Sequence, residues 1–97
     1  MYTGTAVFDL LLPGDSRNLK AKRSYLRPII ALLRKFDVAV AEVGGLELTG
    51  RAEIGIATVA PDAGHVHEVL DTCERAMAGR PEIDLLSVRR RLHGDDD

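Results

Sequence analysis

Five Lys and Arg side chains lie close together near the start of the chain, between Arg17 and Arg27. Cationic groups beside the free amide donors of a helix start are able to hold phosphates. The cluster therefore predicts a surface for RNA, although a solvated helix start that only aids solubility explains it as well. With Arg51, which the expected fold brings to the same end, the predicted RNA-binding residues are Arg17, Lys20, Lys22, Arg23, Arg27 and Arg51.

Acid–base chemistry would need carboxylates, and Asp9, Glu42 and Glu53 are the only ones placed within the first three expected strands. A catalytic pair is conceivable there. Pairing of Asp9 across the sheet with an arginine such as Arg89 is a simpler explanation. We therefore predict no catalytic residues.

The sequence gives little support for a reactive thiol or a metal site. Cys73 falls on the apolar stripe of a helix, which predicts a small buried core residue. His65 and His67 point to different faces of that helix, while His67 and Asp71 have the i, i+4 spacing of a helical metal pair without a third ligand. The two glycine-rich phosphate-binding patterns, G-x-G-x-x-G and G-x-x-x-x-G-K-[ST], do not occur in the sequence. We expect no metal, no cofactor and a non-enzymatic protein.

Length and composition limit the class of protein. A chain of 97 residues, 45% hydrophobic and 29% charged, is typical of one globular domain. The net charge of -2 predicts no strong global attraction to nucleic acid. A single cysteine, the absence of a signal-like start and the lack of a bilayer-length apolar run indicate a cytoplasmic protein that does not associate with a membrane.

Periodicity predicts four strands and two helices. Alternating apolar residues indicate strands, and Leu26, Ile29, Ile30 and Leu33 form the stripe of a first helix. Pro28 implies that this helix either starts late, near Arg27, or kinks. A second helix opens at Pro61 and Asp62 and closes at Gly79 and Pro81. The expected strands are 2–12, 38–43, 51–60 and 83–92.

This order of elements predicts an α+β fold of the ferredoxin-like β-α-β-β-α-β kind, with a four-stranded antiparallel sheet in the order 4-1-3-2 and two helices on one face. We expect a single domain over residues 1–93 and an acidic disordered tail over 94–97. The sheet face without helices is partly apolar and predicts a homodimer or another protein interface. Its predicted interface residues are Thr5, Val7, Asp9 and Leu11.

Four segments of the chain resemble a known family. They cover residues 18–24, 36–44, 51–57 and 65–71, the first of which reads NLKAKRS. In order and spacing they are similar to the bacterial YlxP-type family of small ferredoxin-like proteins. The resemblance implies a ferredoxin-like fold and, from the usual gene neighbourhood among translation and ribosome-maturation factors, a link to ribosomes or RNA. It supplies no catalytic residues. The loop 44–50 departs from the family pattern, which is more polar there.

Three functional hypotheses follow. The first is a cytoplasmic, non-enzymatic module that binds ribosomal RNA, a ribosomal subunit or a ribosome-assembly particle through the basic cluster. The second is a homodimeric protein-interaction module that uses the open sheet face. The third, suggested only by the unusual loop, is an accessory or catalytic protein of a specialised pathway.

Overall fold

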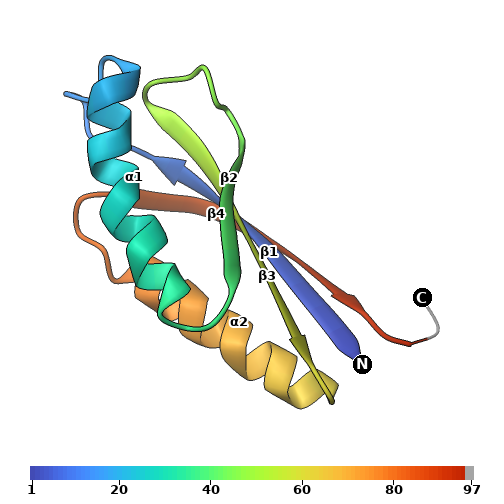
Figure 1. The fold of residues 1–97 in the computed structure, drawn as a ribbon. Coiled ribbons are helices and arrows are strands. Elements are labelled where there is room, and N and C mark those ends of the chain that lie inside the picture. The colour runs from blue at the N-terminus through green and yellow to red at the C-terminus, as the bar shows by residue number, and fades with distance from the viewer. Residues whose placement is uncertain (96–97) are drawn as a thin grey trace.

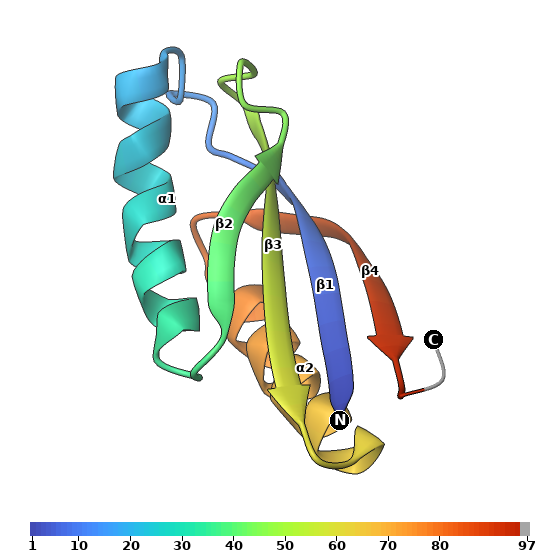
Figure 2. The same ribbon diagram turned by 45° about the vertical axis from the view of Figure 1, so that its right-hand side comes forward.

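Six elements follow one another in the predicted order in a computed structural model that describes residues 1–95. The strands form one antiparallel sheet in the order β2-β3-β1-β4. Both helices cover the same face of this sheet (Figures 1 and 2). The predicted ferredoxin-like α+β fold is therefore confirmed. The elements are β1 (Tyr2–Leu11), α1 (Leu19–Arg34), β2 (Ala39–Gly44), β3 (Arg51–Ala60), α2 (Ala63–Ala78) and β4 (Asp84–His93).

Strand β1 lies in the interior of the sheet. Buried and more exposed residues alternate along it, and the buried ones face the core. Every second residue from Gly4 to Leu10 is buried, and Phe8 and Leu10 are fully inaccessible. Helix α2 packs closely over Gly4, because a Cβ atom there would lie 2.2 Å from a methyl group of Val66. The absence of a side chain at Gly4 thus lets α2 approach the sheet.

Helix α1 begins at Leu19, well before Arg27, where one of the two predicted alternatives placed its start. The Asn18 side chain caps the helix by accepting a hydrogen bond of 2.8 Å from the amide of Ala21. Pro28 lies inside the helix but on its exposed side, so the carbonyl that lacks its usual donor faces water. The expectation of a start near Arg27 is therefore wrong.

Helix α2 follows the predicted limits. Asp62 caps it by accepting a hydrogen bond of 2.8 Å from the amide of His65. Cys73 is buried, as its position on the apolar stripe predicts. Burial raises the pKa of its thiol, with a smaller opposing effect from Arg90.

The start of β1 and the end of β4 lie side by side at one end of the sheet (Figure 2). Asp95 forms an ion pair with the amino group of Met1. The rest of the predicted acidic tail, residues 96 and 97, lies outside the described residues. Within residues 1–95, no helix combines the length and the apolar character needed to span a membrane.

Because α2 packs closely against β1, a methyl group added at Gly4 should destabilise the fold. Gly4→Ala should lower the free energy of unfolding by about 1–3 kcal/mol, because the new carbon overlaps the Val66 side chain. Gly14→Ala is the matched control, since no atom lies within 4 Å of a Cβ atom at that position. Urea denaturation measures both changes, and equal midpoints for the two variants would contradict this packing.

Candidate functional site

Three chain segments meet at one end of the sheet, which we call the hairpin end: the end of β1, the start of α1 and the β2–β3 loop, residues 45–50 (Figure 1). The Leu12 amide donates a hydrogen bond of 2.9 Å to the Gly50 carbonyl. The Ser16 hydroxyl donates one of 2.6 Å to the Thr49 carbonyl. These contacts hold the loop against the start of α1, as the expected topology requires.

Lys22 is buried at the centre of the hairpin end, with 2% of its surface exposed. Its ammonium group donates hydrogen bonds of 2.7 and 2.6 Å to the carbonyl oxygens of Gly45 and Leu48. It also lies 2.7 Å from Glu42 Oε2. This third contact is an ion pair without the alignment of a hydrogen bond. Lys22 is therefore unable to reach RNA, and its assignment to the exposed basic surface is wrong.

A local pattern already pointed to the burial of Lys22. The residue precedes Leu26 by four positions and Ile29 by seven, which places it on the buried stripe of α1. Lysine is almost never fully buried unless it is paired, so the residue type argued against a buried position for Lys22. Only the carbonyl groups and the carboxylate supplied by the hairpin make this burial tolerable.

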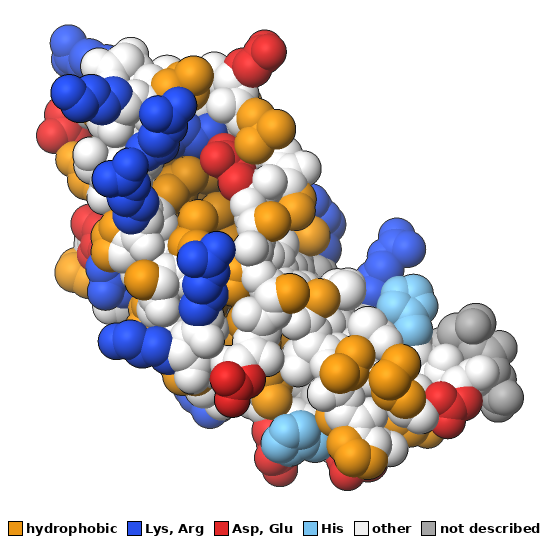
Figure 3. All heavy atoms as spheres, viewed as in Figure 1, with side chains coloured by type: hydrophobic (Ala, Val, Ile, Leu, Met, Phe, Trp, Pro, Cys, Tyr) orange, Lys and Arg blue, Asp and Glu red, His pale blue; other side chains and the backbone are white. Residues whose placement is uncertain are grey.

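The other cations of α1 remain on the surface. Lys20, Arg23, Arg27 and Arg34 are exposed and follow one another at spacings of three, four and seven residues, which places them on one face of the helix. This basic stripe extends over about 21 Å at the usual helical rise. None of its members forms an ion pair with any residue in the described part of the chain. Figure 3 shows Lys and Arg side chains along this side of the molecule.

Arg17 and Arg51 differ from the basic stripe. Arg17 is exposed just before α1, and its Nε atom donates a long hydrogen bond of 3.4 Å to the Gly14 carbonyl. Arg51 lies at the start of β3, where its guanidinium pairs with Asp9 at 2.7 Å. In the pairing of β1 with β3, Arg51 lies opposite Leu11, whose side chain is on the helix-free face of the sheet. The structure thus separates Arg51 from the predicted cluster.

The carboxylates considered for catalysis do not gather at one site. Asp9 and Glu53 are cross-strand neighbours on the helix-free face, beside a small pocket of about 220 Å³. Glu42 alternates to the opposite face and contacts Lys22. The expected cross-strand pairing of Asp9 with an arginine is confirmed, but the partner is Arg51, because Arg89, named as an example, pairs with Glu53 at 2.9 Å. Each of the two neighbouring carboxylates is engaged by an arginine.

Metal-ligating residues are equally dispersed. Among residues 1–95, no three His, Cys, Asp or Glu side chains are grouped closely enough to hold a metal ion. Asp71, which shares helical spacing with His67, directs its carboxylate to an arginine instead.

The open sheet face is the side of the sheet that the helices leave bare. All four predicted interface residues, Thr5, Val7, Asp9 and Leu11, lie on it. A shallow hollow of about 370 Å³ lies on it, over β2, β3 and β1. Besides Thr5 and Val7, small or β-branched residues line the hollow, among them Ala39, Ala41, Val43, Gly55 and Ala57.

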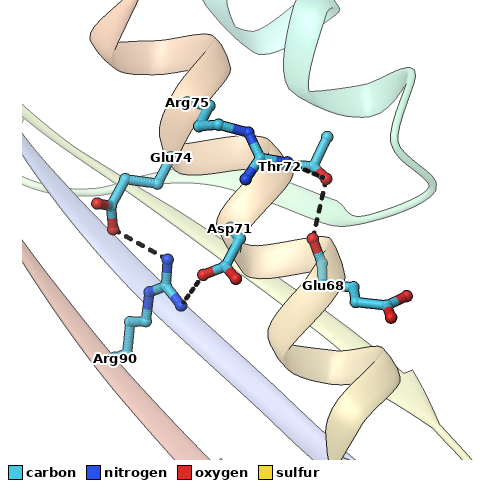
Figure 4. A network of polar contacts seen from close by, with 6 residues as sticks. All are labelled: Glu68, Asp71, Thr72, Glu74, Arg75 and Arg90. Carbon is cyan, nitrogen blue, oxygen red and sulfur yellow. Dashed lines mark hydrogen bonds and ion pairs between the residues drawn. The ribbon is translucent and has the colours of Figure 1, made fainter.

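Arg90 connects β4 to α2 on the covered side of the sheet (Figure 4). Its guanidinium donates hydrogen bonds of 2.8 Å to Asp71 and 3.0 Å to Glu74. Burial opposes the charge of Arg90, but the two carboxylates raise its pKa above the ordinary value. The hydrogen bond from Arg90 lowers the pKa of Asp71, although partial desolvation opposes the effect. The charge of Arg90 therefore serves to join β4 to α2.

Removal of the buried ammonium should destabilise the fold. Lys22→Met leaves the Glu42 carboxylate and two loop carbonyls without their partner, so we expect the free energy of unfolding to fall by about 3 kcal/mol, the low end for a buried pair. Lys20→Met removes the same group from the exposed side of α1 and should change it by less than about 0.5 kcal/mol. Chemical denaturation measures both. Lys22→Met/Glu42→Leu should recover part of the loss, and equal stability of the two single variants would refute the role of the pair.

The ion pair of Asp71 should make stability depend on pH. Because the pKa of Asp71 is lower in the folded protein than the ordinary 3.8, the ionised group stabilises the fold above 3.8. This contribution is lost as the pH falls through the lowered pKa. Thermal melts should therefore show Asp71→Asn to be less stable than the parent protein at neutral pH, with a difference that shrinks in acid. A difference independent of pH would exclude this linkage.

Comparison with known proteins places the chain in a family. A family model described as "Protein of unknown function (DUF503)" matches residues 3–90. A comparison with curated proteins gives no match. The matched region contains α1, the β2–β3 loop, α2 and most of the sheet. The chain therefore belongs to the DUF503 family.

Proposed function

We propose that the protein is a non-enzymatic module that binds ribosomal RNA, in a ribosomal subunit or an assembling particle, through the basic stripe of α1. The residues in contact with RNA phosphates are Lys20, Arg23, Arg27 and Arg34, with Arg17 at the start of the helix. This function places the protein in the cytoplasm, where ribosomes are assembled.

The observation that carries the proposal is the absence of carboxylate partners along this helix. The sequence of α1 contains no Asp or Glu. Elsewhere in the described residues, Arg51, Arg89 and Arg90 are each paired with a carboxylate. A cation that already has a carboxylate partner gains less from a phosphate, whereas the unpaired cations of α1 retain their full charge for it.

The shape of the stripe fits a backbone contact. A straight row of charges about 21 Å long is able to follow successive phosphates of one nucleic acid strand. The open sheet face lacks aromatic side chains on β3, so base stacking of the kind used by sheet-based RNA-binding modules is not available there. Contacts to phosphates by α1 therefore predict affinity that depends on salt more than on base sequence.

Similarity to the YlxP-type family supports the same function. The segment 18–24, which starts α1 and carries two of the stripe residues, is among those that resemble this family. The family's usual gene neighbourhood contains translation and ribosome-maturation factors. The loop 45–50, which differs from the family pattern, lies next to this segment and presents Leu46 and Leu48 to solvent.

Substitution within the stripe tests the proposal. Arg23→Gln/Arg27→Gln removes two exposed cations, so binding to 30S and 50S subunits should weaken and the slope of log K against log salt should become shallower by about 0.7–0.9 per phosphate contact removed. Binding measured over a salt series checks this expectation. Lys22 is left intact because its replacement would disturb the fold.

Arg75→Glu is the matched control, because it lowers the net charge by the same amount on an exposed site of α2. It should leave the salt slope unchanged, and neither variant should shift the thermal midpoint strongly. If the parent protein fails to bind either subunit at low salt, or if the two variants bind equally, the basic stripe is not an RNA-binding surface.

A further inference from the structure

The open sheet face is a partly apolar surface that the helices leave uncovered. Both helices lie on the opposite side, as Figures 1 and 2 show. Val43 and Val59 have 54% and 59% of their surfaces exposed, and Leu11 has 41%. A contiguous apolar surface of this kind on a small protein usually marks an interaction site.

Small side chains make close approach to this face possible. Ala39, Ala41, Gly55 and Ala57 form much of the hollow of about 370 Å³, and Val7 borders it on β1. Nothing larger than a methyl group projects from the four small residues. A second sheet is therefore able to pack against it at the usual separation of about 10 Å.

The charges on the face favour a second copy as the occupant. Asp9 pairs with Arg51, and Glu53 pairs with Arg89, so the carboxylates beside the hollow are neutralised within the same chain. A two-fold axis places identical surfaces against each other, and the internal pairing of these four charges reduces self-repulsion. Arg91, opposite Thr5 on the same face, is exposed and has no ion-pair partner among the described residues. Paired arginines also offer little to the phosphates of a nucleic acid. The basic stripe of α1 has the opposite character and would repel its own copy.

The size of the face predicts a weak dimer. Strands of ten residues extend over about 33 Å, and four strands span about 19 Å at the usual spacing. The flat area is therefore about 600 Å² per copy, or about 1,200 Å² for the pair, which is the lower end for a specific interface. Because β2 is shorter, the true contact is somewhat smaller. An interface of this size is typical of weak, reversible association.

We propose that two copies of the chain pack their open sheet faces together in a two-fold symmetric homodimer. The layers run helices, sheet, sheet, helices. Because α1 lies on the outer side of each sheet, the dimer carries one basic stripe on each of its two outer surfaces. The dimer goes beyond the proposed RNA-binding function and does not depend on it.

A charge placed in the hollow tests the proposal. Sedimentation equilibrium of the intact chain over the micromolar range should show a weight-average mass that rises with concentration towards that of a dimer. Ala57→Arg, at the floor of the hollow, should raise the dissociation constant at least tenfold, because the guanidinium would be buried between the sheets without a partner. Val43→Arg, at a more exposed site, should have the same effect without loss of stability.

Ala31→Arg is the control, since it places the same side chain on the exposed face of α1. It should leave the dissociation constant unchanged. A monomer at every concentration overturns the proposal, and so does self-association that Ala57→Arg and Val43→Arg leave intact. If the parent chain is monomeric while the two variants lose binding to ribosomal subunits, the face belongs to a different partner.

Discussion

The buried ammonium group of Lys22 is the interaction on which the hairpin end of the protein depends. It joins α1, strand β2 and the β2–β3 loop through two backbone carbonyls and the Glu42 carboxylate. Burial of an isolated charge is costly, so the position is tolerable only while all three oxygen atoms stay in place. The loop and the start of α1 are therefore held in one relative position.

Charge is distributed differently on the two sides of the sheet. On the covered side, the exposed cations of α1 have no carboxylate partners among the described residues, while Arg90 is engaged by Asp71 and Glu74. On the open side, two Asp or Glu residues each meet an arginine. The first surface is suited to an anionic polymer and the second to a nearly neutral, partly apolar contact. The net charge of -2 describes neither of them.

The two proposed surfaces are compatible because they lie on opposite sides of one sheet. A dimer that buries both open faces keeps both copies of α1 accessible, and two linked sites bind a polymer more tightly than one when the geometry allows both to engage. The DUF503 family match spans both surfaces. The loop next to the basic stripe accepts hydrogen bonds from Lys22 yet exposes the side chains of Leu46 and Leu48. This chain therefore presents an apolar tip at the β2–β3 loop.

Local patterns in the sequence determined the elements of this fold. Strand 51–60 has the predicted limits, β2 and β4 are displaced from theirs by one residue, and Cys73 is buried on the expected helix face. These features depend on residues a few positions apart, where periodicity and capping act directly. The order of the elements then restricts the sheet to very few topologies, because crossovers are right-handed.

Only the tertiary structure decided which charged groups are free. Lys22, Arg51 and Arg89 are ordinary basic residues in the sequence, but each meets a carboxylate from a distant part of the chain. The sequence predicted an arginine partner for Asp9, but which arginine it is depends on register and on how far a long side chain reaches across neighbouring strands. Charge pairing is a long-range property of the folded chain, whereas the positions of strands and helices are largely local, and this difference is the physical reason that the fold was predictable and much of the candidate site was not.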